Sequence, residues 1–150
     1  MSDNSEEQSF PNEPPFKDGA SSFGAFYPKN YVLAVFAGEA TAKQAADGAL
    51  GLGFSPDEVI VASGAVVVAH ERDVEADKGI LSKIGEQLSR LYTDESADSQ
   101  TLVHLAGQGA AFVLVYAPED DHTTKAAACL RAFGPTVMRK YGTLAITELS

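Results

Sequence analysis

The sequence predicts an α+β fold, a ferredoxin-like βαβ–βαβ sandwich with an extra helical insert between its two halves. Apolar runs typical of buried strands alternate with alanine-rich stretches of helical periodicity. A weak internal repeat relates the halves, because residues 35–39 (VFAGE) resemble residues 115–119 (VYAPE) and a lysine followed by alanines comes next in both. Two strand–helix–strand units of this kind form one sheet with helices on one face. Chance similarity between two alanine-rich helices is the alternative explanation.

The first half is expected to begin with a buried strand over residues 31–37, YVLAVFA. A helix follows from about Ala40, and small residues on its inner face predict close packing against the sheet. These inner residues are Ala42, Ala45, Ala46 and Ala49. Gly51 and Gly53 suit a left-handed helix end. A turn and a second strand over residues 59–62 complete this half.

The middle of the chain is expected to hold the helical insert. Residues 65–73 combine three valines, which favour a strand, with a run that suits a helix, and both interpretations stay open. Apolar residues recur at i, i+4 and i+7 over residues 80–91, which predicts an amphipathic helix. A second, shorter helix is expected around residues 102–106, closed by Gly107 and Gly109.

The second half repeats the pattern of the first. Residues 111–117 (AFVLVYA) predict a third strand, and the acidic residues that follow suit a helix start. The helix itself is expected over residues 125–133, with Gly134 as its C-cap. Apolar and polar residues then alternate, which predicts two final strands, over residues 136–141 and 143–149.

The domain organisation is expected to be a disordered acidic tail over residues 1–29 and a single α/β domain over residues 30–150. Prolines, serines, asparagines and acids dominate the tail, and such a composition does not bury enough apolar surface to offset the entropy lost on ordering. Aromatic residues nevertheless recur in it, and they are candidate partner-binding residues. They are Phe10, Phe16, Phe23, Phe26 and Tyr27. In the alternative interpretation the last of them pack on the edge of the domain itself.

Composition narrows the function classes. The chain of 150 residues carries 21 acidic and 11 basic residues, a net charge of −10 that disfavours nucleic-acid binding. No apolar run approaches the roughly 20 residues that span a bilayer, so membrane insertion is not expected. The N-terminus does not read as a secretory signal, and the single cysteine is consistent with a reducing compartment, so a cytoplasmic location is expected.

Several segments together resemble a known family. They are VLAVFAGEATAKQAADGALGLGF, a short strand ending in SG, the helical insert, AFVLVYAPED and CLRAFGPTVMRKYGTLAITEL. The chain resembles bacterial general-stress or heat-induced stress proteins and related small domains of unknown function over residues 31–149. The resemblance implies a cytoplasmic, non-catalytic α/β domain associated with stress, and it brings no catalytic residues.

No catalytic residues, metal site or cofactor are predicted. The histidines have no i, i+4 spacing and no cysteine partner; they are His70, His104 and His122. Cys129 lies in an alanine-rich helix, which is typical of a small buried thiol. The glycines of residues 48–53 come at the end of a helix, whereas a phosphate site needs them at its start.

The sequence therefore favours a non-enzymatic, stress-associated interaction or accessory module that self-associates, as a dimer, and docks a protein partner through its N-terminal tail. The strand over residues 143–149 is a candidate pairing edge. The alternative is a regulatory domain that senses a small ligand at a dimer interface. A third, less favoured hypothesis is an enzyme of unfamiliar type that uses Cys129 or His70.

Overall fold

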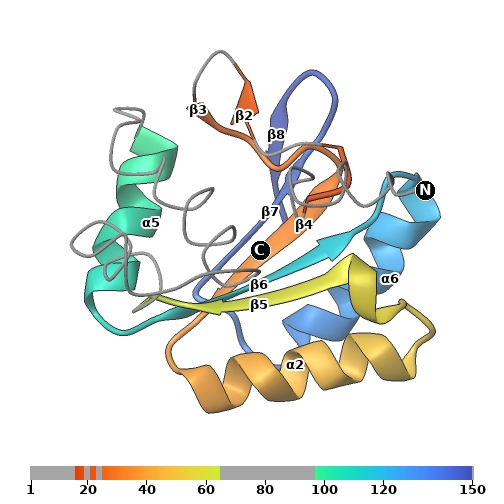
Figure 1. Ribbon diagram of the computed structural model, residues 1–150, viewed down its shortest axis with the longest axis horizontal. Coiled ribbons are helices and arrows are strands. Elements are labelled where there is room, and N and C mark those ends of the chain that lie inside the picture. Colours follow the sequence, from red (N-terminus) through yellow and green to blue (C-terminus); the bar gives the residue numbers. More distant parts are fainter. Residues whose placement is uncertain (1–15, 19–20, 23–24, 65–96, 150) are drawn as a thin grey trace, which may run out of the picture.

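The computed structural model describes residues 16–18, 21–22, 25–64 and 97–149 (Figure 1). It is an α+β fold built on a five-stranded antiparallel sheet of order β5-β6-β4-β7-β8. The strands are β4 (Tyr31–Phe36), β5 (Val59–Ser63), β6 (Ala111–Tyr116), β7 (Val137–Tyr141) and β8 (Ile146–Glu148). The helices are α2 (Glu39–Gly51), α5 (Ala97–Gly107) and α6 (Asp120–Arg131). Two short strands, β2 (Ser21–Ser22) and β3 (Ala25–Phe26), pair antiparallel with each other.

Each predicted strand and helix of both halves has a counterpart in the structure, but α6 begins at Asp120, well before its predicted start at residue 125. Helix α6 ends at Arg131, two residues before the predicted end, so its C-cap is Ala132 and not Gly134 as predicted; the chain then turns through Gly134 at φ +72°. Helix α5 starts at Ala97, ahead of its predicted apolar stretch. Strand β8 is shorter than predicted because its pairing with β7 runs only from Ile146 to Glu148. The uncertain segment 65–73 and the predicted helix 80–91 lie outside the described residues.

One face of the sheet packs against α2 and α6. The buried alanines of α2 bring that helix close to Val32, Ala34 and Phe36, which alternate with residues facing the other side of β4. A Cβ on Gly48 would lie 3.2 Å from the Cys129 sulfur, so this glycine lets α2 and α6 approach closely. Small residues on both helices thus set the distance between the helices and the sheet.

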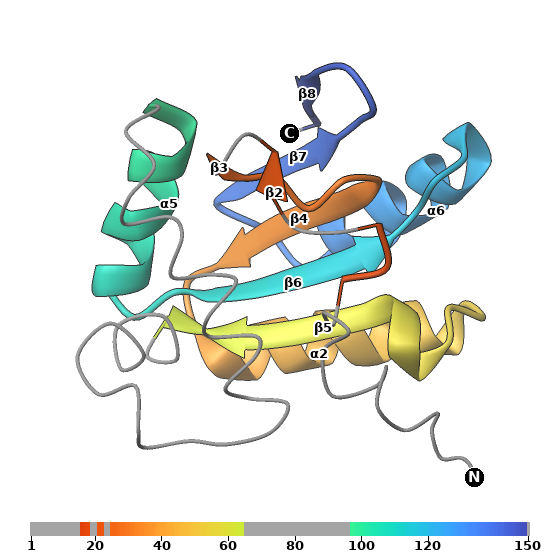
Figure 2. The same ribbon diagram turned by 45° about the horizontal axis from the view of Figure 1, so that its top comes forward.

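The opposite face of the sheet is also covered (Figure 2). Tyr31, Leu33 and Val35 lie in a second buried cluster with Leu102 of α5 and with Phe16 from the N-terminal segment. The paired strands β2 and β3 lie on this same side, away from α2 and α6. The sheet therefore sits between two layers. Among the helices that the structure describes, none has the length and apolar character to cross a bilayer.

Candidate functional site

The N-terminal segment packs against the domain at one end of the sheet. We call residues 16–18 the strap; they lie where β4 begins, where β6 ends and beside the short 3-10 helix η1 (Pro56–Glu58) that leads into β5. The Phe16 side chain is only 1% exposed, and its ring meets the Tyr31 ring edge to face at 5.3 Å between centroids. Such aromatic pairs contribute about 0.5–1.5 kcal/mol beyond the burial of their area. Phe16 thus anchors the strap in the core.

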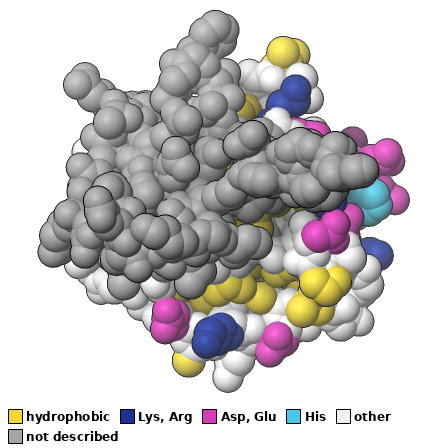
Figure 3. All heavy atoms as spheres, viewed as in Figure 1, with side chains coloured by type: hydrophobic (Ala, Val, Ile, Leu, Met, Phe, Trp, Pro, Cys, Tyr) yellow, Lys and Arg dark blue, Asp and Glu magenta, His cyan; other side chains and the backbone are white. Residues whose placement is uncertain are grey.

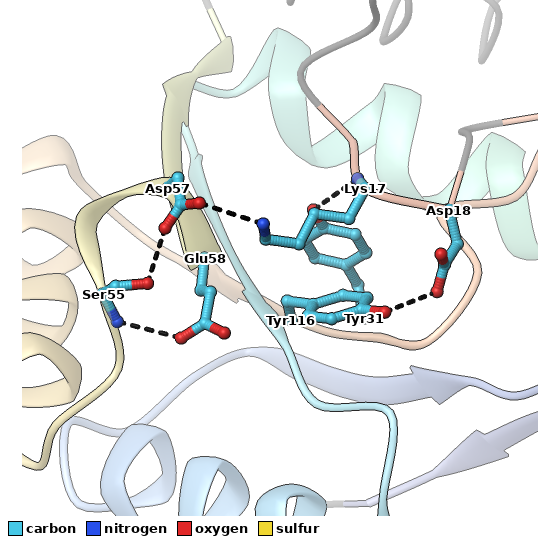
Figure 4. A network of polar contacts seen from close by, with 7 residues as sticks. All are labelled: Lys17, Asp18, Tyr31, Ser55, Asp57, Glu58 and Tyr116. Atoms are coloured by element: carbon cyan, nitrogen blue, oxygen red, sulfur yellow. Dashed lines mark hydrogen bonds and ion pairs between the residues drawn. The ribbon is translucent and has the colours of Figure 1, made fainter.

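Lys17 ties the strap to two elements at once (Figure 4). Its backbone N–H donates a hydrogen bond to the Tyr31 hydroxyl at 2.9 Å. Its ammonium group pairs with the Asp57 carboxylate of η1 at 2.9 Å and lies 5.8 Å from the centre of the Tyr116 ring. The hydrogen bond to Asp57 is the largest cause that raises the pKa of Lys17. Because this ion pair is exposed, its stabilising effect is small.

Asp18 closes the other side of the strap. Its Oδ2 accepts hydrogen bonds from Asn30 Nδ2 and from the Tyr116 hydroxyl, both at 2.8 Å. The Asn30 bond and then the Tyr116 bond lower the pKa of Asp18. Donation to this carboxylate is in turn the largest cause that raises the pKa of Tyr116. The carboxylate is therefore held ionised between two neutral donors.

The segment around η1, which contacts the strap, is held in place by its own local hydrogen bonds. Ser55 Oγ donates to Asp57 Oδ1 at 2.5 Å, and the Ser55 backbone N–H donates to Glu58 Oε1 at 2.9 Å. The Ser55 bond, followed by the Lys17 bond, lowers the pKa of Asp57. Burial raises the pKa of Tyr31 to about 12, so this hydroxyl stays protonated and can still accept the Lys17 N–H bond at neutral pH. The Asp57 carboxylate that binds Lys17 is thus oriented by a hydrogen bond within its own segment.

A pocket of about 250 Å³ lies beside this network. It is lined by Leu52, Gly53, Phe54, Glu58, Tyr116, Pro118, His122 and Lys125. Helix α6 contributes the two basic groups, and the Lys125 ammonium lies 5.9 Å from the centre of the Phe54 ring. Tyr116 lines the pocket and also binds the strap, so the two features share a wall. The apolar and polar side chains that line the pocket suit a small molecule with one apolar and one polar end.

The structure places two of the candidate tail aromatics against the domain itself. Phe16 is buried as described, and the Tyr27 hydroxyl donates to the Gly142 carbonyl at 2.6 Å while its ring packs on Tyr141. In this state both side chains are engaged by their own domain, as in the second interpretation of the tail. Phe10, Phe23 and the side chain of Phe26 lie outside the described residues.

The residues considered for chemistry do not converge in the part of the chain that the structure describes. His104 and His122 are exposed on different helices, and His70 lies outside the described residues. No group of three metal-ligating side chains is found among the described residues. Burial raises the pKa of the half-buried Cys129, which opposes the thiolate form that reacts.

Sequence reasoning missed Lys17, Asp18 and Tyr116 as a connected group. Lys17 meets Asp57 across 40 residues of chain, and Asp18 meets Tyr116 across 98. No periodic pattern encodes such contacts. The one visible signal was the Ser55-x-x-Glu58 pattern, which predicts a capping box and so marks Asp57 as an oriented carboxylate.

Comparison of the chain with protein-family models, with curated proteins and with solved structures finds no match.

Proposed function

We propose that this chain is a non-enzymatic interaction and accessory module that binds a short, aromatic-containing segment at one end of its sheet, self-associates, and docks a protein partner through its N-terminal tail. The strap carries this proposal. A three-residue segment with one buried aromatic ring, one backbone hydrogen bond and two charged side chains in defined contacts is the arrangement by which domains recognise peptides.

The domain is proposed to have ferredoxin-like architecture. Strands β4 and β5 are joined through α2, and β6 lies between them, which supports a split βαβ unit. Strands β6 and β7 are likewise joined through α6, and β4 lies between them. Helix α5 would be the described part of the insert between the halves, and β8 an addition at the edge. The stress association and the cytoplasmic location rest on the sequence resemblance and on the single cysteine.

In this proposal the strap is a ligand that the domain holds in cis and that a partner competes for. Phe16 and Lys17 cannot contact a partner while they contact Tyr31 and Asp57. Partner docking by these residues therefore requires release of the strap, which is held by the buried Phe16 ring, by the Lys17 N–H bond to Tyr31 and by the exposed polar contacts of the Lys17 and Asp18 side chains. Exposed contacts of this kind open more readily than the core of a sheet.

A peptide titration tests the proposal. A chain without residues 1–18 is mixed with a fluorescent peptide of residues 10–22, and its fold is checked by circular dichroism. We expect saturable binding in trans and a loss of affinity of at least about tenfold with the Phe16→Ala peptide, because the buried ring is the anchor. The matched control is the Phe10→Ala peptide, which keeps the strap unchanged. Equal binding by the wild-type and Phe16→Ala peptides would contradict the proposal.

The pocket favours a second candidate function, small-ligand sensing. The sequence suggested a ligand at a dimer interface, whereas this pocket belongs to a single chain. A thermal-shift screen with nucleotides, amino acids and haem tests it, and His122→Ala with Lys125→Ala should abolish any shift. A shift that survives both substitutions would place the ligand elsewhere.

A further inference from the structure

The two edges of the described sheet differ in chemistry. At one edge β8 has three residues and includes Glu148, which pairs with Arg139 at 3.2 Å. At the other edge β5 has five residues, VIVAS, and no charge. Short or charged edge strands resist pairing with another chain, whereas long, uncharged ones favour it. The chain thus blunts one edge and leaves the other suited to pairing.

Strand β5 presents backbone groups at this edge. The Gly64 N–H donates to the Ala110 carbonyl at 2.7 Å, so Gly64 points toward β6. Backbone groups alternate in direction along an antiparallel strand, so Ala62 and Ile60 also point toward β6. Val61 and Ser63 therefore direct their N–H and C=O groups toward the open edge of the described sheet.

An apolar groove of about 240 Å³ runs beside this edge, between β5 and α2. We call it the edge groove; it is lined by Lys43, Ala46, Asp47, Leu50, Pro56, Val59 and Val61. Leu50 is 38% exposed. Figure 3 shows yellow hydrophobic side chains at the surface where Figure 1 places α2 and β5, with basic and acidic side chains next to them. Exposed apolar surface rimmed by charge is typical of an interface.

The charges of the edge groove favour a second copy of this chain as its occupant. Lys43 and Asp47 are both exposed and lie one helical turn apart on α2, and neither forms an ion pair with another described residue. A two-fold axis that passes midway between them brings Lys43 of each copy to Asp47 of the other. This pattern is complementary to itself, as an isologous interface requires. It also balances locally a chain that otherwise carries ten excess negative charges.

We infer that the edge groove binds a second copy of this chain, with β5 pairing antiparallel to its counterpart and α2 packing beside its counterpart. This inference rests on the self-association included in the proposed function, and it names the surface that performs it. The two five-stranded sheets become one continuous sheet with the blunted β8 at both ends. The assembly therefore closes as a dimer.

Sedimentation equilibrium of the full chain and its variants tests this inference. Lys43→Glu and Asp47→Lys should each raise the dimer dissociation constant at least about tenfold, because each sets two like charges against each other. The Lys43→Glu/Asp47→Lys double variant should return it to within about threefold of wild type, since the charges are complementary again. Val61→Lys should abolish dimerisation, because a lysine on an edge strand opposes strand pairing.

Thr147→Lys is the matched control, since it places the same charge on β8, and its dimer should match wild type. A wild-type chain that stays monomeric at every concentration would overturn self-association itself, and the inference with it. A wild-type dimer that Lys43→Glu and Val61→Lys both leave unchanged would overturn the edge groove as the surface while self-association stands. Because Lys43 is exposed, we expect Lys43→Glu to fold. Its result therefore distinguishes a lost interface from a Val61→Lys protein that fails to fold.

Discussion

Gly134 lies in the turn that follows α6, in a backbone conformation that side chains disfavour. Its φ is +72°, and a Cβ built there meets no heavy atom within 4 Å, so conformation alone sets the cost of a substitution. Gly134→Val should lower the free energy of unfolding by more than about 1 kcal/mol, because a β-branched residue resists the left-handed region. Urea denaturation measures this. Gly51→Ala, at an uncrowded helical position, is the control and should be neutral or slightly stabilising; equal effects would mean that Gly134 does not impose the turn.

At Gly64, by contrast, the surrounding backbone leaves no room for a side chain. A Cβ there would lie 2.5 Å from the Ala106 carbonyl oxygen and 2.7 Å from that of Ala110, both of them backbone atoms. Gly64→Ala should therefore lower the free energy of unfolding by about 1–3 kcal/mol, because β5 and α5 must move apart. The same denaturation experiment, with Gly107→Ala as the unhindered control, checks this. A stable Gly64→Ala protein would mean that α5 does not lie against the end of β5.

At the scale of elements, acid should release the strap before it affects contacts without carboxylates. Hydrogen bonds hold the pKa of Asp18 and of Asp57 below their usual values. A depressed folded pKa contributes stability above the unfolded value of about 3.9, and that contribution is lost as the pH falls through the folded value. Strap docking should therefore weaken below about pH 4.

NMR of the Tyr116 and Phe16 rings against pH measures this release. Asp18→Asn is the control: its amide oxygen has two lone pairs and can still accept both hydrogen bonds that Oδ2 accepts, but the substitution removes the ionisation. Its docking should be weaker at neutral pH and less dependent on pH. A strap that stays docked with the same pH profile in both proteins would show that Asp18 does not hold it.

The regular elements were predictable because their signals are local. The alternation in β7 and the buried run of β4 come from neighbouring residues, and the alanines of α2 lie at helical spacing. The contacts of the N-terminal segment are not local, since Tyr27 meets Gly142 across 115 residues. Its polar composition therefore predicted a tail, although Phe16 contributes to the core.

On the scale of the whole molecule, both faces of the sheet are covered. The alanine-rich helices fill one side, as the repeat predicted, and α5 with the strap helps to cover the other. The candidate site could not be predicted, because Lys17, Asp57 and Tyr116 meet only once the strand order is fixed. The crowding at Gly64 likewise depends on α5, which is distant in sequence.

The domain holds its own N-terminal segment through the contacts of Phe16, Lys17 and Asp18. Hydrogen exchange of the Lys17 amide in the full chain reports on this docking, since the N–H donates to the buried Tyr31 hydroxyl. We expect exchange at least about tenfold slower than in an unstructured chain, and faster exchange in Tyr31→Phe, which lacks the acceptor. A Lys17 amide that exchanges at the unstructured rate in the wild-type protein would contradict it.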